Sequence, residues 1–195
     1  MRVLVVGATG TIGRAVVAGL QGRHEVVPAH RRGKVRVDLA DPGSIALLYH
    51  VVGRVDAVVS CAGDARFGPL AELKDDDFAY SLANKLMGQV NLVRLGFAAV
   101  SDGGSFTLTS GILARKPSPG SAAISLVNGG LEAFVGAATL EAPRGIRVNV
   151  VSPPWVSETL AALQMDPAQG LPAATVARAY VRSVEGTDRG AVLQP

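Results

Sequence analysis

A glycine-rich turn, GATGTIG (residues 7–13), follows the first apolar run of the chain and constrains its fold more than any other feature. The run itself, RVLVVGA (2–8), is continuous and rich in β-branched residues, which predicts a strand buried on both faces. Gly7, Gly10 and Gly13 would allow a tight turn, close approach of a pyrophosphate, and close packing of the next helix. This context predicts the strand–turn–helix unit of a dinucleotide-binding domain. The spacing G-x-x-G-x-x-G differs from the common G-x-G-x-x-G fingerprint, so a purely structural glycine turn is the alternative.

Strand and helix patterns alternate along the chain, which predicts a doubly wound parallel sheet covered by helices on both faces, a Rossmann-type α/β fold with three layers. Its length of 195 residues fits one domain, 1–195, and the sequence shows no linker or internal repeat. The expected strands are 2–8, 25–30, 34–39, 54–63, 104–111, 146–153 and a short one in 190–194. The expected helices are 12–22, 42–52, 75–100, 121–142 and 172–184.

Local signals support some of these bounds. Asp41 and Pro42 are a good N-cap and first residue for the second helix, and Gly53 would end it. Pro28 weakens the second strand, because proline removes a ladder hydrogen bond. The acids DDD (75–77) fall at a helix start, where negative charge stabilises the helix dipole.

The composition indicates a globular chain, with 48% hydrophobic and 18% charged residues. Runs such as RVLVVGA and VDAVVSCAG are too short to span a bilayer, and the sequence predicts no secretory signal and no membrane partner. Cys61 is the single cysteine, so no disulfide can form within the chain, and we expect a cytoplasmic location. We expect no metal site.

Basic residues crowd the segment HRRGKVR (30–36), in a chain of net charge +3. Such a cluster could bind the phosphate of a small cofactor or a nucleic acid, or it could be a solvated loop. It follows the second strand, where an acid would bind the ribose of NAD and a basic residue would accept the extra phosphate of NADP. The segment offers His30, Arg31 and Arg32 and no carboxylate, which predicts NADP(H), with Arg31 as the first choice for its phosphate and Arg32 as the second. Nucleic-acid binding is not expected, because the cluster lacks interleaved aromatics and a basic recognition helix.

Several motifs resemble the short-chain dehydrogenase/reductase family over nearly the whole chain. They are the GATGTIG turn, DL (38–39), SCAG (60–63) where members usually have N-N-A-G, LTSG ending at 111, and the long run GGLEAFVGAATLEAPRGIRVNVVSP (129–153). The resemblance implies a cofactor site on four groups of residues: the glycine turn, the ends of the second and third strands, the strand end near 61, and the end of the strand 146–153. We expect it to contain Gly7, Thr9, Gly10, Thr11, Ile12, Gly13, Arg31, Arg32, Asp38, Leu39, Cys61, Ala62, Gly63 and Pro153.

The family's catalytic Tyr and Lys are absent. Members use a Tyr that moves the proton, a Lys four residues later, a Ser that steadies the substrate oxygen, and an Asn on the preceding helix. Ser110 occupies the serine position, and anchoring on GGLEAF places Ile124 and Asn128 at the Tyr and Lys positions. A shift by one residue would place Ala123 and Val127 there, which restores neither group.

The Asn position is also changed, because aligning Gly88 in NKLMGQVNL (84–92) places Lys85 there, with Asn84 one step away. A lysine and an asparagine thus exchange helices. We expect Lys85, Ser110 and Asn128 to form the catalytic group, with Lys85 as the proton donor if burial lowers its pKa. The alternative is that Lys85 is an ordinary surface lysine. Tyr80 is expected to face elsewhere.

The remaining features concern the substrate and the assembly. The lid (154–172) is short and has Pro154 where the family has Gly, so Trp155 and Val156 should edge a shallow pocket. The first functional hypothesis is an NADP-dependent oxidoreductase for a carbonyl or alcohol, with an altered active site. The second is a non-catalytic NADP(H)-binding sensor or structural protein, and the missing Tyr and Lys leave enzymatic activity open. The helices 75–100 and 121–142 are rich in Ala and Gly, and the resemblance implies that they pair in a homodimer or homotetramer.

Overall fold

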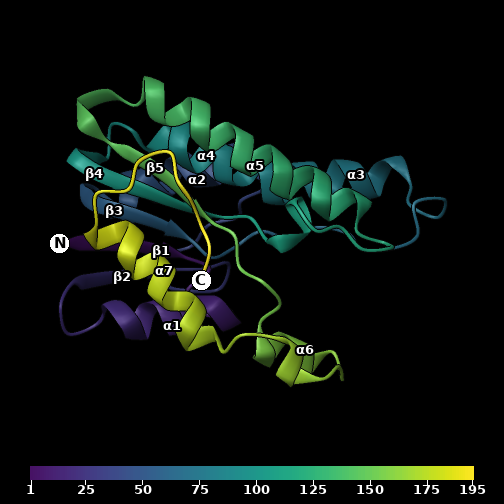
Figure 1. Ribbon diagram of the computed structural model, residues 1–195. Coiled ribbons are helices and arrows are strands. Elements are labelled where there is room, and N and C mark those ends of the chain that lie inside the picture. Colours follow the sequence, from purple (N-terminus) through teal and green to yellow (C-terminus); the bar gives the residue numbers. More distant parts are fainter.

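The computed structural model describes residues 1–195 and contains one sheet of six parallel strands between two layers of helices (Figure 1). The strands are β1 (Arg2–Val6), β2 (Glu25–Ala29), β3 (Val55–Ser60), β4 (Val100–Thr109), β5 (Arg147–Val151) and β6 (Val192–Leu193). Their order in the sheet is β2-β1-β3-β4-β5-β6. The chain moves outward from β1 to β2 and then returns to the other side of β1, which creates a switch point between β1 and β3. The predicted fold class is confirmed.

The helices divide between the two faces of the sheet. In Figure 1, α1 and α7 lie below the sheet and α4 and α5 above it, while α3 and α6 project beyond it on one side. The α-helices are α1 (Thr11–Leu20), α2 (Pro42–Val52), α3 (Asp75–Ser81), α4 (Gly88–Gly96), α5 (Ala122–Glu141), α6 (Ser157–Ala162) and α7 (Ala173–Glu185). A π-helical turn, η1 (Leu82–Met87), joins α3 to α4, and three short 3-10 turns complete the structure: η2 (Ile112–Ala114), η3 (Pro143–Gly145) and η4 (Pro167–Gln169).

Each face of the sheet has its own hydrophobic core. Leu4 and Val6 of β1 belong to a cluster of 22 buried residues shared with α2, α4 and α5. Val3 and Val5 belong to a second cluster of 16 residues shared with α1 and α7. Because successive side chains of a strand point to opposite faces, this division confirms that the first apolar run is a strand buried on both faces.

The expected strand at 34–39 does not form. Only an isolated bridge joins Val35 to Ala29 of β2. Beyond it the backbone enters a local turn, in which the Asp38 carboxylate accepts from Ala40 N and the Asp38 N–H donates to the hydroxyl of Ser44 on α2. Because these groups are satisfied locally, no ladder extends past the bridge. β2 is therefore an edge strand, which explains how Pro28 is tolerated within it.

The expected helix at 75–100 is divided. The π-helical turn η1 interrupts it, with the Gly88 N–H bonded to the carbonyl of Ala83 five residues earlier. Gln89, fully buried, donates to the carbonyl of Lys85 at 3.2 Å and to the carbonyl of Thr109 at 3.0 Å. It thereby ties the π turn to the end of β4. The helix itself ends at Gly96, because the chain turns there into β4.

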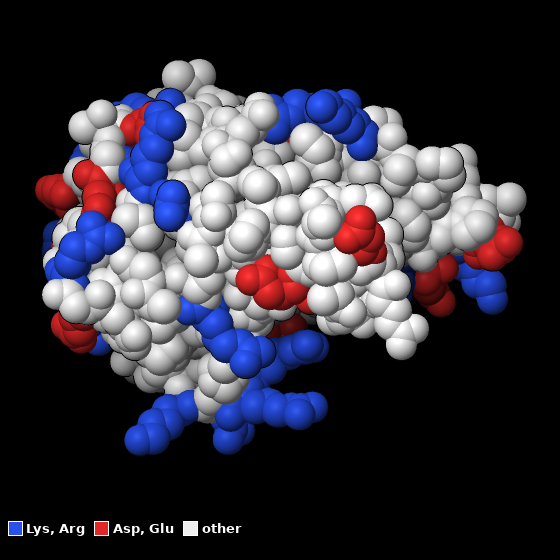
Figure 2. Space-filling view, turned by 60° about the horizontal axis from the view of Figure 1, so that its bottom comes forward, with Lys and Arg blue, Asp and Glu red and all other residues white.

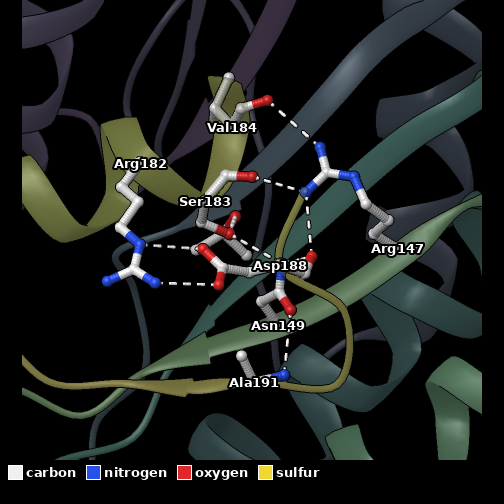
Figure 3. Close-up of polar contacts among 8 residues, drawn as sticks. Arg147, Asn149, Arg182, Ser183, Val184, Asp188 and Ala191 are labelled. Carbon is white, nitrogen blue, oxygen red and sulfur yellow. Dashed lines mark hydrogen bonds and ion pairs between the residues drawn. The ribbon is translucent and has the colours of Figure 1, made fainter. Parts of the chain in front are cut away.

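The amino end of the sheet is closed by a polar network around Arg147 at the start of β5 (Figure 3). Its guanidinium donates to the carbonyls of Ser183 at 2.8 Å, Asp188 at 3.1 Å and Val184 at 3.3 Å. Asn149 donates to the Ser183 hydroxyl and the Asp188 carbonyl. These bonds satisfy carbonyls at the end of α7 that have no helical partner, so the network fixes α7 on the sheet. It lies away from the carboxyl edge, where parallel sheets bind ligands.

One helix, α5, is long and apolar enough to cross a membrane by length and composition, with a mean hydropathy of 1.4. This is weak evidence, because a core helix of a globular domain passes the same test. Leu131 and Val135 of α5 are fully buried against the sheet.

Candidate active site at the carboxyl edge of the sheet

Two adjoining cavities lie at this edge of the sheet. The larger of the two, of about 750 Å³, opens at the switch point between β1 and β3. The glycine turn forms one wall, the strand end Cys61–Gly63 another, and the segments after β2 the third. The lining residues are Val6, Gly7, Thr9, Gly10, His30, Arg31, Arg32, Val37, Asp38, Leu39, Cys61, Ala62, Gly63, Asp64 and Asn84. The cavity thus lies where an open α/β sheet binds a nucleotide.

The three glycines of the turn are needed for different structural reasons. Gly7 has φ 81°, and a Cβ there would lie 2.8 Å from Ala62. A Cβ on Gly13, which is buried in α1, would overlap the carbonyl oxygen of Gly7. Gly10 is exposed at the start of α1, and its nearest obstacle is the same oxygen at 3.4 Å. Gly7 and Gly13 are therefore required by packing, while Gly10 leaves the rim of the cavity open.

The basic residues after β2 stand at the rim of this cavity. Arg31 and Arg32 are exposed and line it beside half-buried His30. Figure 2 shows several Lys and Arg side chains that project together from the lower edge of the molecule, while Asp and Glu are scattered over the rest of that face. No carboxylate interrupts the run 30–36. Neither Arg31 nor Arg32 takes part in an ion pair of the chain, so both are available to an anion, although Asp38 and Asp64 also line the cavity.

A smaller cavity, of about 250 Å³, adjoins the first, because Cys61, Ala62 and Gly63 line both. It combines the candidate catalytic positions with the lid. Its other lining residues are Ile12, Lys85, Thr109, Ser110, Gly111, Ile112, Leu113, Ile124, Asn128, Pro153, Pro154, Trp155, Val156 and Thr159. Burial raises the pKa of the Cys61 thiol, which keeps it protonated.

Lys85 is a buried wall residue of the smaller cavity and not a surface lysine. Its side chain extends from η1, is only 9% exposed, and packs so closely that a Cβ on Gly63 would lie 3.1 Å from Lys85 Cγ. Burial lowers the pKa of Lys85 to about 8, and the negative charge of Asp64 opposes this shift. A lysine with such a pKa is populated in both protonation states at mildly alkaline pH, as a proton-transfer group requires.

Ser110 lies at the end of β4 and is 3% exposed. Its N–H donates to the carbonyl of Val151, and its hydroxyl donates to Glu132 Oε1 at 2.8 Å. Glu132 in turn lies 3.6 Å from the guanidinium of Arg115. Ser110, which occupies the family's serine position, therefore has a carboxylate partner on α5.

The register of α5 follows from which side chains reach the cavity. Ile124 and Asn128 both line it, while Ala123 and Val127 are fully buried elsewhere. This arrangement favours the register that places Ile124 and Asn128 at the Tyr and Lys positions over the one-residue shift. Asn128 is 2% exposed, and its Oδ1 has no hydrogen-bond partner. Buried amide oxygens are normally satisfied, so this atom is one to which a ligand could donate.

Most predicted cofactor residues line one of the two cavities. Ile12 and Pro153 line the smaller one, and Thr11 and Gly13 line neither. Thr11 is the exposed first residue of α1, and Gly13 acts through packing. Tyr80 lines neither cavity either, and its hydroxyl donates to Asp64 at 2.7 Å.

Three site residues escaped sequence reasoning. Glu132 binds Ser110, Gln89 joins the Lys85 carbonyl to the end of β4, and Asp64 lines the larger cavity and influences the Lys85 charge. Glu132 carried a usable signal, because it follows Asn128 by four residues and so shares its helix face. The structure contains no group of three or more His, Cys, Asp or Glu side chains that could hold a metal ion.

Residues 13–192 match a family described as enoyl-(acyl carrier protein) reductase. The human 3-oxoacyl-[acyl-carrier-protein] reductase is 33% identical over 108 residues, which are 54% of this chain and 46% of that protein. The sepiapterin reductase of Chlorobaculum tepidum is 28% identical over 177 residues, which are 83% of this chain and 71% of that protein. The match to the human relative thus spans less than half of that protein's length.

Solved structures resemble the whole chain. Protein lin1944 from Listeria innocua has a TM-score of 0.96 and 43% identity, covering 100% of this chain and 98% of that one. A small-chain dehydrogenase has a TM-score of 0.87 and 26% identity, with 100% and 95% coverage. Another, in complex with NADPH, shares the fold at 0.89 with 24% identity and 100% and 96% coverage. With the family match over most of its length, the chain belongs to the short-chain dehydrogenase/reductase family of oxidoreductases.

Proposed function

We propose that this protein binds NADP(H) in the larger cavity and acts as an oxidoreductase on a carbonyl or alcohol held in the smaller one. The observation that carries the proposal is the meeting of Lys85 and Ser110 in a cavity that shares a wall with the nucleotide-sized one. The glycine turn would receive the pyrophosphate, and Arg31, with Arg32 beside it, the additional phosphate. The similarly folded dehydrogenase in complex with NADPH supports this choice of cofactor.

The chain supplies the proton chemistry, while the bound nicotinamide would supply or take the hydride. Ile124 cannot move a proton, so Lys85 takes this role at the substrate oxygen, with its pKa of about 8. Asn128 Oδ1 offers an acceptor inside the same cavity. Gln89 holds the backbone of Lys85 and the end of β4 in fixed relation, which keeps Lys85 and Ser110 on the walls of one site.

Calorimetric titration tests the cofactor assignment. NADPH should bind at least tenfold more tightly than NADH, because only NADPH carries the phosphate that the guanidinium of Arg31 would pair with. Arg31→Ala should weaken NADPH binding about tenfold or more and leave NADH binding nearly unchanged. Arg36→Ala is the matched control, since Arg36 is exposed and does not line the cavity. Equal affinity for both cofactors in the wild type would refute the assignment.

A non-catalytic sensor is the second candidate, and the loss of both family residues at Ile124 and Asn128 favours it. Oxidation of NADPH in the presence of a panel of aldehydes and ketones separates the two. Turnover that is lost in Lys85→Met supports the oxidoreductase. Tight NADPH binding without turnover of any compound, in either direction, supports the sensor.

We propose a homodimer or homotetramer formed through the helical segments 75–100, which contains α3, η1 and α4, and 121–142, which contains α5. Leu126 and Leu140 of α5 are 52% and 83% exposed, and Leu95 of α4 is 37% exposed. A Cβ on Gly129 or Gly136 would meet nothing within 4 Å, so a neighbouring helix could approach closely there. Light scattering of the purified protein should give a multiple of the 20.0 kDa chain mass. A monodisperse monomer would contradict the proposal.

The single cysteine agrees with a cytoplasmic location, which we also propose.

A further inference from the structure

The hydroxyl of Ser110 has its proton committed to a group outside the smaller cavity. Its Oγ lies 2.8 Å from Glu132 Oε1, and an ionised carboxylate can only accept. The serine is therefore the donor. A hydroxyl has one proton and two lone pairs, so Ser110 presents only lone pairs to a ligand.

Glu132 is placed to hold this arrangement. It lies behind Ser110 rather than on the cavity wall, and its side chain is 13% exposed. The guanidinium of Arg115 lies 3.6 Å from the carboxylate, so Glu132 has a cationic neighbour besides the serine. The Ser110 backbone is fixed as well, through its N–H bond to the Val151 carbonyl at 2.9 Å. Ser110 is thus held at its backbone, and the Glu132 carboxylate lies between Ser110 and Arg115.

Lys85 lines the same cavity and, unlike Ser110, can donate a hydrogen bond to a ligand. Its ammonium forms none of the ion pairs of the chain, so it is available to donate to a ligand oxygen. A ligand oxygen that meets both residues must accept from Lys85 and donate to Ser110. A hydroxyl group does both, whereas a carbonyl oxygen cannot donate.

We propose that Glu132 is a positioning residue that fixes Ser110 as a hydrogen-bond acceptor, so that the smaller cavity selects an alcohol over the ketone of the same skeleton. This inference rests on the proposed function only in taking that cavity as the substrate site. The usual role expected from the resemblance, a serine that donates to a carbonyl oxygen, is blocked while Glu132 is ionised.

Binding of cyclohexanol and cyclohexanone to the full chain without cofactor tests the inference, because no turnover can then occur. Dissociation constants come from NMR shift titrations of the isotope-labelled protein. One hydrogen bond of about 1 kcal/mol predicts about fivefold tighter binding of the alcohol. In Glu132→Gln the amide can donate to Ser110 Oγ and release the hydroxyl proton toward the cavity. The preference should then fall to parity or reverse in favour of the ketone.

Two further variants complete the test. Ser110→Ala should also lose the preference for the alcohol. Glu141→Gln removes an exposed carboxylate from the same helix and should keep the wild-type ratio. Equal binding or a ketone preference in the wild type would overturn the inference, as would an unchanged ratio in Glu132→Gln or no binding of either compound. Failure of NADPH to bind, with the alcohol preference intact, would instead remove the proposed cofactor.

Discussion

Gly13→Ala should abolish measurable NADPH binding and lower the free energy of unfolding by about 2–4 kcal/mol. The added Cβ would overlap the Gly7 carbonyl oxygen and lie 3.0 Å from Ala8 Cα, and all of these are backbone atoms that cannot rotate away. Helix α1 would have to move off the sheet and take the glycine turn with it. Urea denaturation followed by circular dichroism measures the stability, and calorimetric titration measures the binding.

Gly10→Ala separates packing from ligand approach. The nearest atom to its Cβ is 3.4 Å away and its φ is −73°, which any residue adopts, so the unfolding free energy should stay within about 0.5 kcal/mol of wild type. The methyl group stands at the cavity rim, however, and should weaken NADPH binding about tenfold or more. If Gly10→Ala bound NADPH as well as the wild type, the proposed place of the pyrophosphate would be wrong.

Lys85→Met should make the cofactor-free protein more stable at pH 7, by about 3 kcal/mol. Burial lowers the pKa of Lys85 from 10.5 to about 8, so the folded state holds a charged lysine at pH 7 in a place that favours the neutral one. At a pH between about 8 and 10.5, Lys85 is protonated in the unfolded chain and deprotonated in the folded chain. The wild type therefore gains stability as the pH rises from about 8 to 10.5, and the advantage of Lys85→Met disappears over the same range.

Urea midpoints of both proteins measured from pH 7 to 10.5 check this expectation. Lys116→Met is the control, because Lys116 is exposed and its replacement should change stability little at any pH. An advantage of Lys85→Met that persisted unchanged at pH 10.5 would mean that packing, and not the buried charge, is responsible.

Much of the fold could be predicted from local pattern. The run at β1, the Asp41 cap whose carboxylate accepts from the Gly43 N–H at 2.8 Å, and the helix stop at Gly53 all hold as expected. The segment 34–39 misled because its apolar residues do alternate, and Val37 and Leu39 are buried. They are buried beneath a loop, since the turn at Asp38 and the Ser44 hydroxyl take the hydrogen bonds that a strand would need.

The positions of single site residues could be predicted from the family resemblance. The hydrogen bonds between site residues could not. Ile124, Asn128 and Lys85 line the smaller cavity at the positions that alignment gave them. The bond between Ser110 and Glu132 joins residues 22 positions apart, so the helical spacing of Glu132 from Asn128 could indicate its helix face but not its partner. The π turn from which Lys85 extends was also absent from the sequence prediction, because the apolar pattern continues through it as in an ordinary helix.

The shared cavity has a consequence for anyone who would rebuild the missing pair. Introducing Ile124→Tyr with Asn128→Lys would bring a second ammonium into the cavity whose wall already holds the buried Lys85. Two like charges in such surroundings repel strongly, and one of them would have to lose its proton. The identities of residues 85 and 128 are therefore coupled. A variant with lysine at position 128 would also need Lys85 replaced, because changing only one position leaves the cavity with two lysines or with none.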